Sequence, residues 1–133
     1  MEASFAERIE NVRRRMDEAC RRADRDPSRV KLVAVAKNFG REEVTEAART
    51  GIDIIGESRI QEAKQKIPLC PGSLQWHMVG HLQSNKCRDA VRMFRMIHSV
   101  DSMRLLESID AESRKAGVEM PVCLEVNVSG ERS

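Results

Sequence analysis

Aromatic residues are scarce in this sequence. They make up 3% of its 133 residues and include no tyrosine, so we expect no stacking platform for single-stranded nucleic acid. An excess of charge of one sign is also missing, because 23 Lys and Arg residues face 21 Asp and Glu residues for a net charge of +2. That balance argues against nucleic acid or an anionic membrane as a dedicated partner.

Long apolar segments are missing as well. No run approaches the roughly 18 residues that span a bilayer, and the N-terminal segment lacks the apolar core of a signal peptide. We therefore expect a cytoplasmic protein with no membrane partner. A chain of this length buries roughly two-thirds of its unfolded surface on folding, which suits a single domain over residues 1–133.

The four cysteines, Cys20, Cys70, Cys87 and Cys123, form no Cys-x-x-Cys pair. This spacing argues against a zinc knuckle or a redox pair. We expect reduced thiols that are mostly buried as small apolar side chains.

A basic run, Arg13-Arg14-Arg15, lies in the first predicted helix, over residues 5–23. The run is compatible with a nucleic-acid patch. However, acidic residues such as Glu10 and Asp17 are interleaved with the arginines, which favours the solvated face of an amphipathic helix.

The rest of the chain alternates between short apolar runs and amphipathic segments. The predicted strands are 32–36, 52–55 (ended by Gly56), 74–79, 96–100 and 122–128, and the predicted helices between them are 41–50, 58–66, 84–94 and 101–117. Such alternation predicts a parallel sheet with right-handed crossovers. An open doubly wound sheet and part of a (β/α)₈ barrel both fit. A complete barrel needs about 250 residues, so five strands would be an incomplete one, and the end of the chain directly after a strand resembles a truncation.

Lys37 follows the unbroken apolar run Leu32-Val33-Ala34-Val35-Ala36, which is typical of a strand buried on both faces. Lys37 continues the face of Val33 and Val35, at the strand end where α/β proteins bind ligands. Desolvation there would favour the neutral amine, which attacks an aldehyde to form a Schiff base. The alternative is a lysine that simply extends into solvent.

Other polar side chains also follow strand ends. Ser58 is positioned to cap the next helix, where free amides could meet an anion. His77 shares the face of Val79 and is expected to point inward, whereas His81 lies in the loop beyond. The two histidines do not share a helix face, so their spacing of four gives no support for metal ligation. His98 and Asn127 occupy the ends of the fourth and fifth predicted strands.

Together these segments resemble the pyridoxal phosphate homeostasis protein family. The resemblance is carried by Val33–Lys37, Gly56–Glu62, Trp76–Lys86, His98–Ser102 and Val126–Glu131. The block from Trp76 to Lys86 is long and specific, and the order and spacing of the others agree with it. The resemblance covers the chain from about Arg29 onward but only the N-terminal part of the family's length.

The resemblance implies a fold-type III, alanine racemase-like (β/α)₈ barrel, here incomplete. It implies pyridoxal 5′-phosphate held as a Schiff base on Lys37, in a pocket lined by Ser58, Asn38 and His81. It also implies a non-catalytic carrier that keeps the free aldehyde low and delivers the cofactor to apo-enzymes.

Two departures from the family pattern affect the expected affinity. The family usually carries Asn where this chain has Ser58, a shorter donor toward the cofactor. The family's phosphate clamp lies in its C-terminal part, beyond the length of this chain. We therefore expect weaker cofactor retention than in a complete barrel.

Two other functions stay open at this point. The first is a racemase- or decarboxylase-like enzyme using the same imine, which would need an acid/base partner on its opposite face. The second is an interaction module in which Lys37 is inert. In every case the first and fifth strands should form sheet edges with exposed apolar faces, which predicts self-association.

Overall fold

A computed structural model describes residues 2–132. The ends of the predicted domain, Met1 and Ser133, lie outside the described residues. The α-helices are α1 (Phe5–Arg22), α2 (Arg41–Arg49), α3 (Ile60–Lys66), α4 (Cys87–Met93) and α5 (Met103–Ala116). The strands are β1 (Ala34–Val35), β2 (Ile54–Glu57), β3 (Gln75–Met78), β4 (Met96–Val100) and β5 (Val122–Leu124). Short 3₁₀ helices, η1 to η3, cover Pro27–Arg29, Ile67–Leu69 and Ser84–Lys86.

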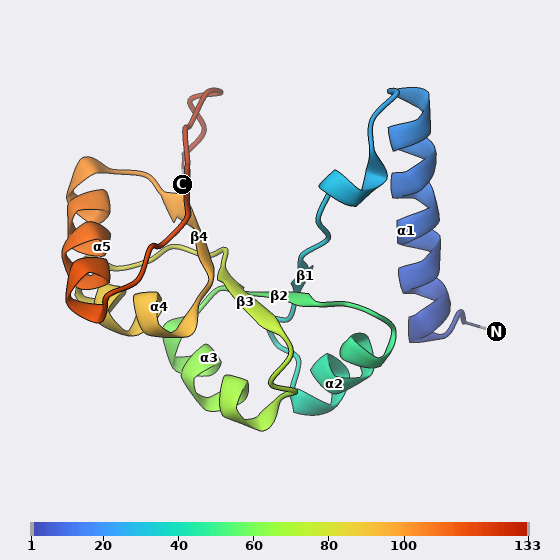
Figure 1. The fold of residues 1–133 in the computed structure, drawn as a ribbon, viewed down its shortest axis with the longest axis horizontal. Helices are drawn as coiled ribbons and strands as arrows, with labels where there is room; N and C mark the ends of the chain where they lie inside the picture. Colours follow the sequence, from blue (N-terminus) through green and yellow to red (C-terminus); the bar gives the residue numbers. More distant parts are fainter. Residues whose placement is uncertain (1, 133) are drawn as a thin grey trace.

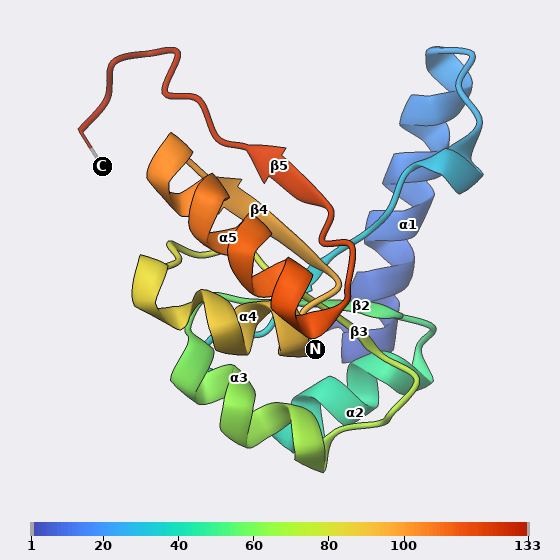
Figure 2. The ribbon, with the colours of Figure 1, turned by 60° about the vertical axis from the view of Figure 1, so that its left-hand side comes forward.

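The five strands form one parallel sheet in the order β1-β2-β3-β4-β5. The sheet curves, with α2 to α5 arranged along its outer side, and α1 stands beside β1 (Figure 1). Figure 2 shows α5 lying along β4 on this outer side. Strand-to-strand order that follows chain order, with a helix after each of β1 to β4, is the arrangement of a partial (β/α) barrel. The prediction of an incomplete barrel is confirmed.

The helix boundaries follow from local sequence signals. The Ser4 side chain caps α1 by accepting from the Glu7 amide. The Glu7 carboxylate in turn accepts from the Ser4 amide, which completes a capping box. Ser102 caps α5 by accepting from the Leu105 amide at 3.1 Å, and Gly117 ends that helix with φ of 68°. These two signals bound the helix predicted over residues 101–117, which is confirmed.

The core lies between the outer side of the sheet and the helices. From the sheet, Ile55, Met78 and Ile97 are almost completely buried, and Ala63 and Ala90 face them from α3 and α4. The small alanines allow the helices to approach the strands closely, since protein cores are packed without large voids. All four cysteines are free thiols, with Cys20 and Cys87 buried and the other two half-buried.

The fifth strand is shorter than predicted. It ends at Leu124 instead of Val128, because the Asn127 carboxamide oxygen accepts from the amides of Gly130, at 2.9 Å, and Glu131, at 3.2 Å. These bonds fold residues 127–131 into a turn, which cannot continue a strand.

The first strand is also shorter, and the prediction that both its faces are buried was wrong. Val35 is 47% exposed, because β1 pairs with β2 only. Gly56 does not end the second strand, which continues through Glu57. The segment predicted as one helix over 84–94 divides into η3 and α4.

Arg13 departs from the interpretation of the basic run as a wholly solvated face. Its guanidinium is half-buried and donates to the carbonyl of Gly51 at 2.7 Å, which ties α1 to the end of α2. Arg14 keeps the expected surface role and pairs with Glu18 at 3.7 Å.

Within residues 2–132, none of the helices is both long enough and apolar enough to cross a membrane.

Candidate functional site

Lys37 lies in a tight turn directly after β1. The Phe39 amide donates to the Ala36 carbonyl at 3.1 Å, so Lys37 and Asn38 are the two central residues of the turn. Asn38 has φ of 67°, a left-handed conformation that Asn tolerates better than most residues. The turn releases the chain from the sheet and leaves the side chains of Lys37 and Asn38 exposed.

The exposure of Lys37 corrects the expectation of a desolvated amine in this chain. The residues before Lys37 do form an apolar face. A Cβ placed on Gly56 would contact the side chains of Val33 at 3.0 Å and Val35 at 3.4 Å, so these two valines point to the same side of the sheet. However, β1 is an edge of the sheet, and the turn carries Lys37 past the last strand pairing. The site therefore presents an accessible amine at a strand end.

Ser58 follows β2 at the level of Lys37. Val35 is paired with Gly56, and Lys37 and Ser58 each lie two residues beyond those partners. Ser58 is half-buried and does not cap α3, whose N-cap residue is Arg59. The predicted capping role was wrong, because the helix begins two residues after Ser58.

Gly80 packs directly against Ser58. A Cβ at Gly80 would lie 2.5 Å from the Ser58 carbonyl oxygen and 2.7 Å from its Cα, so only glycine allows this approach. The loop after β3 is thereby held against the end of β2. This contact places the segment around His81 on the same side of the sheet as Ser58.

His81 links the ends of two further strands. Its Nδ1 lies 3.9 Å from the Asp101 carboxylate, which directly follows β4, and the His81 side chain is 71% exposed. Lys37, Asn38, Ser58 and His81 therefore all follow strand carboxyl ends, as predicted. Among these positions, Ser58 contacts Gly80 and His81 lies beside Asp101.

Two histidines pair on the concave face of the sheet, where His77 is buried and His98 is half-buried. His77 Nδ1 and His98 Nε2 are 2.9 Å apart, so one nitrogen donates and the other accepts. Burial lowers the pKa of His77, and the neighbouring His98 lowers it further. The inward position of His77 is confirmed. Its pairing with His98, which was predicted only to lie at the end of the fourth strand, was not predicted.

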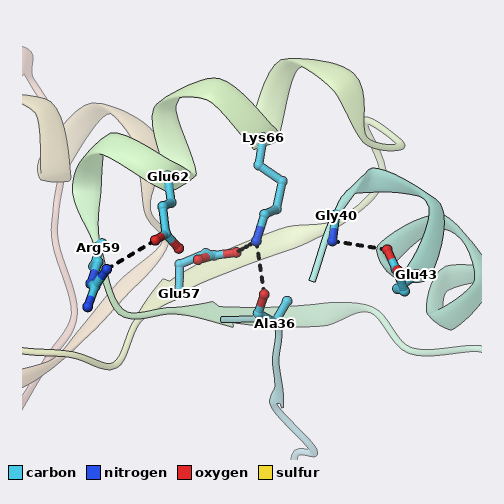
Figure 3. Close-up of polar contacts among 7 residues, drawn as sticks. All are labelled: Ala36, Gly40, Glu43, Glu57, Arg59, Glu62 and Lys66. Carbon is cyan, nitrogen blue, oxygen red and sulfur yellow. Dashed lines mark hydrogen bonds and ion pairs between the residues drawn. The ribbon is translucent and has the colours of Figure 1, made fainter. Parts of the chain in front are cut away.

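On the opposite face of the sheet, Glu57 and Lys66 form a buried ion pair. Glu57 is completely buried, and its Oε1 lies 2.6 Å from Lys66 Nζ. The same Nζ donates to the carbonyl oxygen of Ala36 at 2.9 Å (Figure 3). The ammonium group therefore connects the end of α3 to β2 and to the residue that precedes Lys37.

Sequence reasoning missed this ion pair. Glu57 was part of a recognised motif, but its side chain was not assigned a partner. The available signal was an acidic residue at the end of an apolar strand followed by a lysine at the end of the next helix. Buried acids require such a partner.

The described residues, 2–132, contain no group of three His, Cys, Asp or Glu side chains placed to hold a metal ion.

Comparison with known proteins places this architecture in a family. The profile of the alanine racemase N-terminal domain matches residues 8–133. The chain belongs to this family. The family match agrees with the parallel strand–helix repeats.

Similar sequences share a single descriptive name. The pyridoxal phosphate homeostasis protein of Pseudomonas aeruginosa is 41% identical over 98% of this chain and 57% of its own length. The proteins of that name from Aquifex aeolicus and Escherichia coli are 34% and 30% identical, over 96% and 97% of this chain and 56% and 57% of theirs. The chain thus spans a little over half the length of these curated relatives.

A solved structure extends the comparison. PipY from Synechococcus elongatus without pyridoxal phosphate matches with a TM-score of 0.79 and 38% identity, over 96% of this chain and 56% of PipY. PipY with pyridoxal phosphate bound matches with a TM-score of 0.74 and 40% identity, over 86% of this chain and 54% of PipY.

Proposed function

We propose that this chain binds pyridoxal 5′-phosphate through a Schiff base on Lys37 and serves pyridoxal phosphate homeostasis as a non-catalytic carrier. The observation that supports the proposal most is an accessible primary amine held in a defined turn at a strand carboxyl end. Similar proteins also support the proposal. The curated relatives are named pyridoxal phosphate homeostasis proteins, and one solved structure of PipY has pyridoxal phosphate bound.

The side chains at this edge fit the aldehyde part of the cofactor. A neutral primary amine condenses with an aldehyde and expels water, and exposure of Lys37 lets the aldehyde reach it. Because Gly80 has no side chain, the loop after β3 lies close to the backbone around Ser58. The two segments together form a compact edge against which a planar ring fits. When bound, the cofactor would supply a reactive aldehyde that can be carried in masked form.

The neighbouring residues would orient the ring without reacting with it. Ser58 offers a hydroxyl that both donates and accepts, Asn38 offers an amide, and His81 offers an imidazole at the adjacent strand end. These roles for Ser58, Asn38 and His81 are part of the proposal. We also propose that the recipients of the cofactor are apo-enzymes that depend on it. The cytoplasmic location expected from the sequence stays a prediction.

A carrier fits the site better than a racemase or decarboxylase. Catalysis on the imine requires a group that moves a proton on its opposite face. Tyrosine cannot supply it, because the sequence has none, and the His77–His98 pair is engaged in its own hydrogen bond. Amino-acid turnover that disappears in Lys37→Ala would favour the enzyme instead.

Borohydride reduction followed by peptide mass mapping tests the proposal. Reduction fixes the imine, and we expect the cofactor mass on the peptide containing Lys37 and essentially complete loss of it in Lys37→Ala. Lys31→Ala is the matched control, because Lys31 is an exposed lysine just before β1. No label, or label spread equally over other exposed lysines, would leave Lys37 an inert residue and favour the interaction module.

A further inference from the structure

The buried ion pair beneath the site is the feature that the proposed function does not use. Glu57 and Lys66 lie between β2 and α3 (Figure 3). The Lys66 side chain is only 11% exposed and that of Glu57 is fully buried. The other carboxylate oxygen, Glu57 Oε2, is buried without a hydrogen-bond partner.

Stability alone does not explain such a pair. Removing two charges from water costs free energy that their attraction only partly offsets, and well-packed apolar replacements are often neutral or stabilising. The orphaned Oε2 adds to that cost. The geometry offers another reason for the pair, because Lys66 Nζ has a third partner in the Ala36 carbonyl, 2.9 Å away.

The Ala36 carbonyl is the anchor of the turn that carries Lys37. It accepts from the Phe39 amide at 3.1 Å and from Lys66 at 2.9 Å, while the Ala36 amide donates to the Gly56 carbonyl at 2.9 Å. A free strand end of only two residues would otherwise fray. Both polar groups of Ala36 are thus fixed, one by the sheet and one by the ammonium of α3.

We propose that Lys66, held in place by Glu57, is a positioning residue that fixes the turn presenting Lys37 to its aldehyde substrate. This inference rests on the proposed function of Lys37. Glu57 directs the Lys66 side chain, Lys66 holds the Ala36 carbonyl, and that carbonyl sets the direction in which the chain leaves β1. The ion pair acts through the backbone and touches no ligand.

The double variant Glu57→Leu/Lys66→Met separates positioning from stability. It replaces the pair with apolar side chains, so the unfolding midpoint should stay close to that of the wild type. We expect reducible adduct at Lys37 to form about tenfold more slowly with pyridoxal phosphate, since misplacement of a reacting group by about 1 Å can cost more than that. We also expect faster hydrogen exchange at the Phe39 amide. A wild-type rate and unchanged Phe39 exchange would overturn the proposal.

Two single variants decide the question if the double variant fails to fold. Both variants break the ion pair. Lys66→Met also removes the hydrogen bond to the Ala36 carbonyl, whereas Glu57→Gln keeps Lys66 and leaves an acceptor beside it, so only Lys66→Met frees that carbonyl. Positioning predicts slower adduct formation and faster Phe39 exchange in Lys66→Met alone, and equal effects in both variants would overturn it. Lys64→Met is the control on the same helix, because Lys64 forms only an exposed pair with Asp89.

The two proposals fail in different ways. If the wild type forms no reducible adduct at Lys37, the proposed function is wrong, and Phe39 exchange in the variants still decides whether Lys66 holds the turn. If the wild type forms the adduct but Lys66→Met and the double variant form it at the same rate, the proposed function stands and the positioning role is wrong.

Discussion

The lack of a side chain at Gly80 lets the loop after β3 pack closely against the end of β2. In Gly80→Ala, the new methyl group would lie 2.5 Å from the Ser58 carbonyl oxygen, and the nearest atoms are mostly backbone. Because backbone cannot move aside as a flexible side chain does, we expect a loss of about 1–3 kcal/mol in the free energy of unfolding. Urea denaturation measures it.

Gly72→Ala is the matched control for this prediction. A Cβ at Gly72 would meet no atom within 4 Å, so we expect that variant to be at least as stable as the wild type. Equal unfolding midpoints for the two variants would show that the segments around Gly80 and Ser58 separate at little cost, and the compact edge proposed for the cofactor ring would lose its support.

His77 makes stability depend on pH. Its pKa is lowered in the folded protein, first by burial and then by His98, so the unfolded chain binds a proton at higher pH than the folded chain does. Stability is therefore present above the ordinary pKa of about 6.5 and is lost as the pH falls through the lowered folded pKa. Thermal unfolding between about pH 7 and pH 5 should show a falling midpoint, with a smaller slope in His77→Leu.

Stability in a more acidic pH range depends on three carboxylates whose pKa is lowered: Glu7, Asp26 and Glu42. Hydrogen bonds lower the pKa of each below an already acidic ordinary value, so they lose their contribution at a lower pH than His77 does. A slope that is identical in the wild type and in His77→Leu would contradict the assignment of the pH 7 to 5 range to His77.

At the residue scale, the sequence predicted which polar side chains lie at strand ends but not the residues that support them. Lys37, Ser58 and His81 were found because polar residues at strand ends stand out against apolar strands. Lys66 and Glu57 were missed because their pairing depends on how α3 folds back over β2, and spacing along the chain does not show this. The exposure of Lys37 was missed because an apolar run does not reveal which strand lies at an edge.

At the scale of elements, α5 depends on its N-cap. The Ser102 hydroxyl accepts from the Leu105 amide at 3.1 Å, which satisfies one of the free amides of the first turn. We expect Ser102→Ala to lower the free energy of unfolding by about 1 kcal/mol. Ser108→Ala is the control, because Ser108 lies mid-helix and bonds the Arg104 carbonyl, where alanine is the better helix former. If both variants lose equal stability, the cap does not hold the helix.

Helices were predicted more accurately than edge strands, for a physical reason. Caps and periodicity are local, so the start of α2 at Arg41 and the stop of α5 at Gly117 could be located from neighbouring residues. A strand also needs a partner. β4, which is paired on both sides, matched its prediction at both ends, whereas β1 and β5, paired on one side, are shorter than their apolar patterns.

At the scale of the molecule, the parallel sheet and the chain order of its strands were predictable because alternating strands and helices with short loops allow few topologies. The direction in which the sheet curves was not predictable, because it depends on which face of the sheet the helices cover. Figure 1 shows them all along one side, apart from α1. The opposite face carries the hydrogen-bonded pair of His77 and His98.

The segment that includes and follows β5 predicts self-association. Leu124, Val126 and Val128 are 69%, 71% and 91% exposed, and β5 is paired with β4 alone. Alternating apolar residues next to an unpaired strand edge favour pairing with a second chain. In sedimentation velocity we expect the wild type to be heavier than its 15.1 kDa monomer, and Val126→Lys/Val128→Lys to shift it toward the monomer by adding charge at the edge. Leu69→Lys is the control, since Leu69 is 57% exposed in η2, which leads into β3, a strand paired on both sides. A wild type that sediments as a monomer at every concentration would show that these edges do not pair.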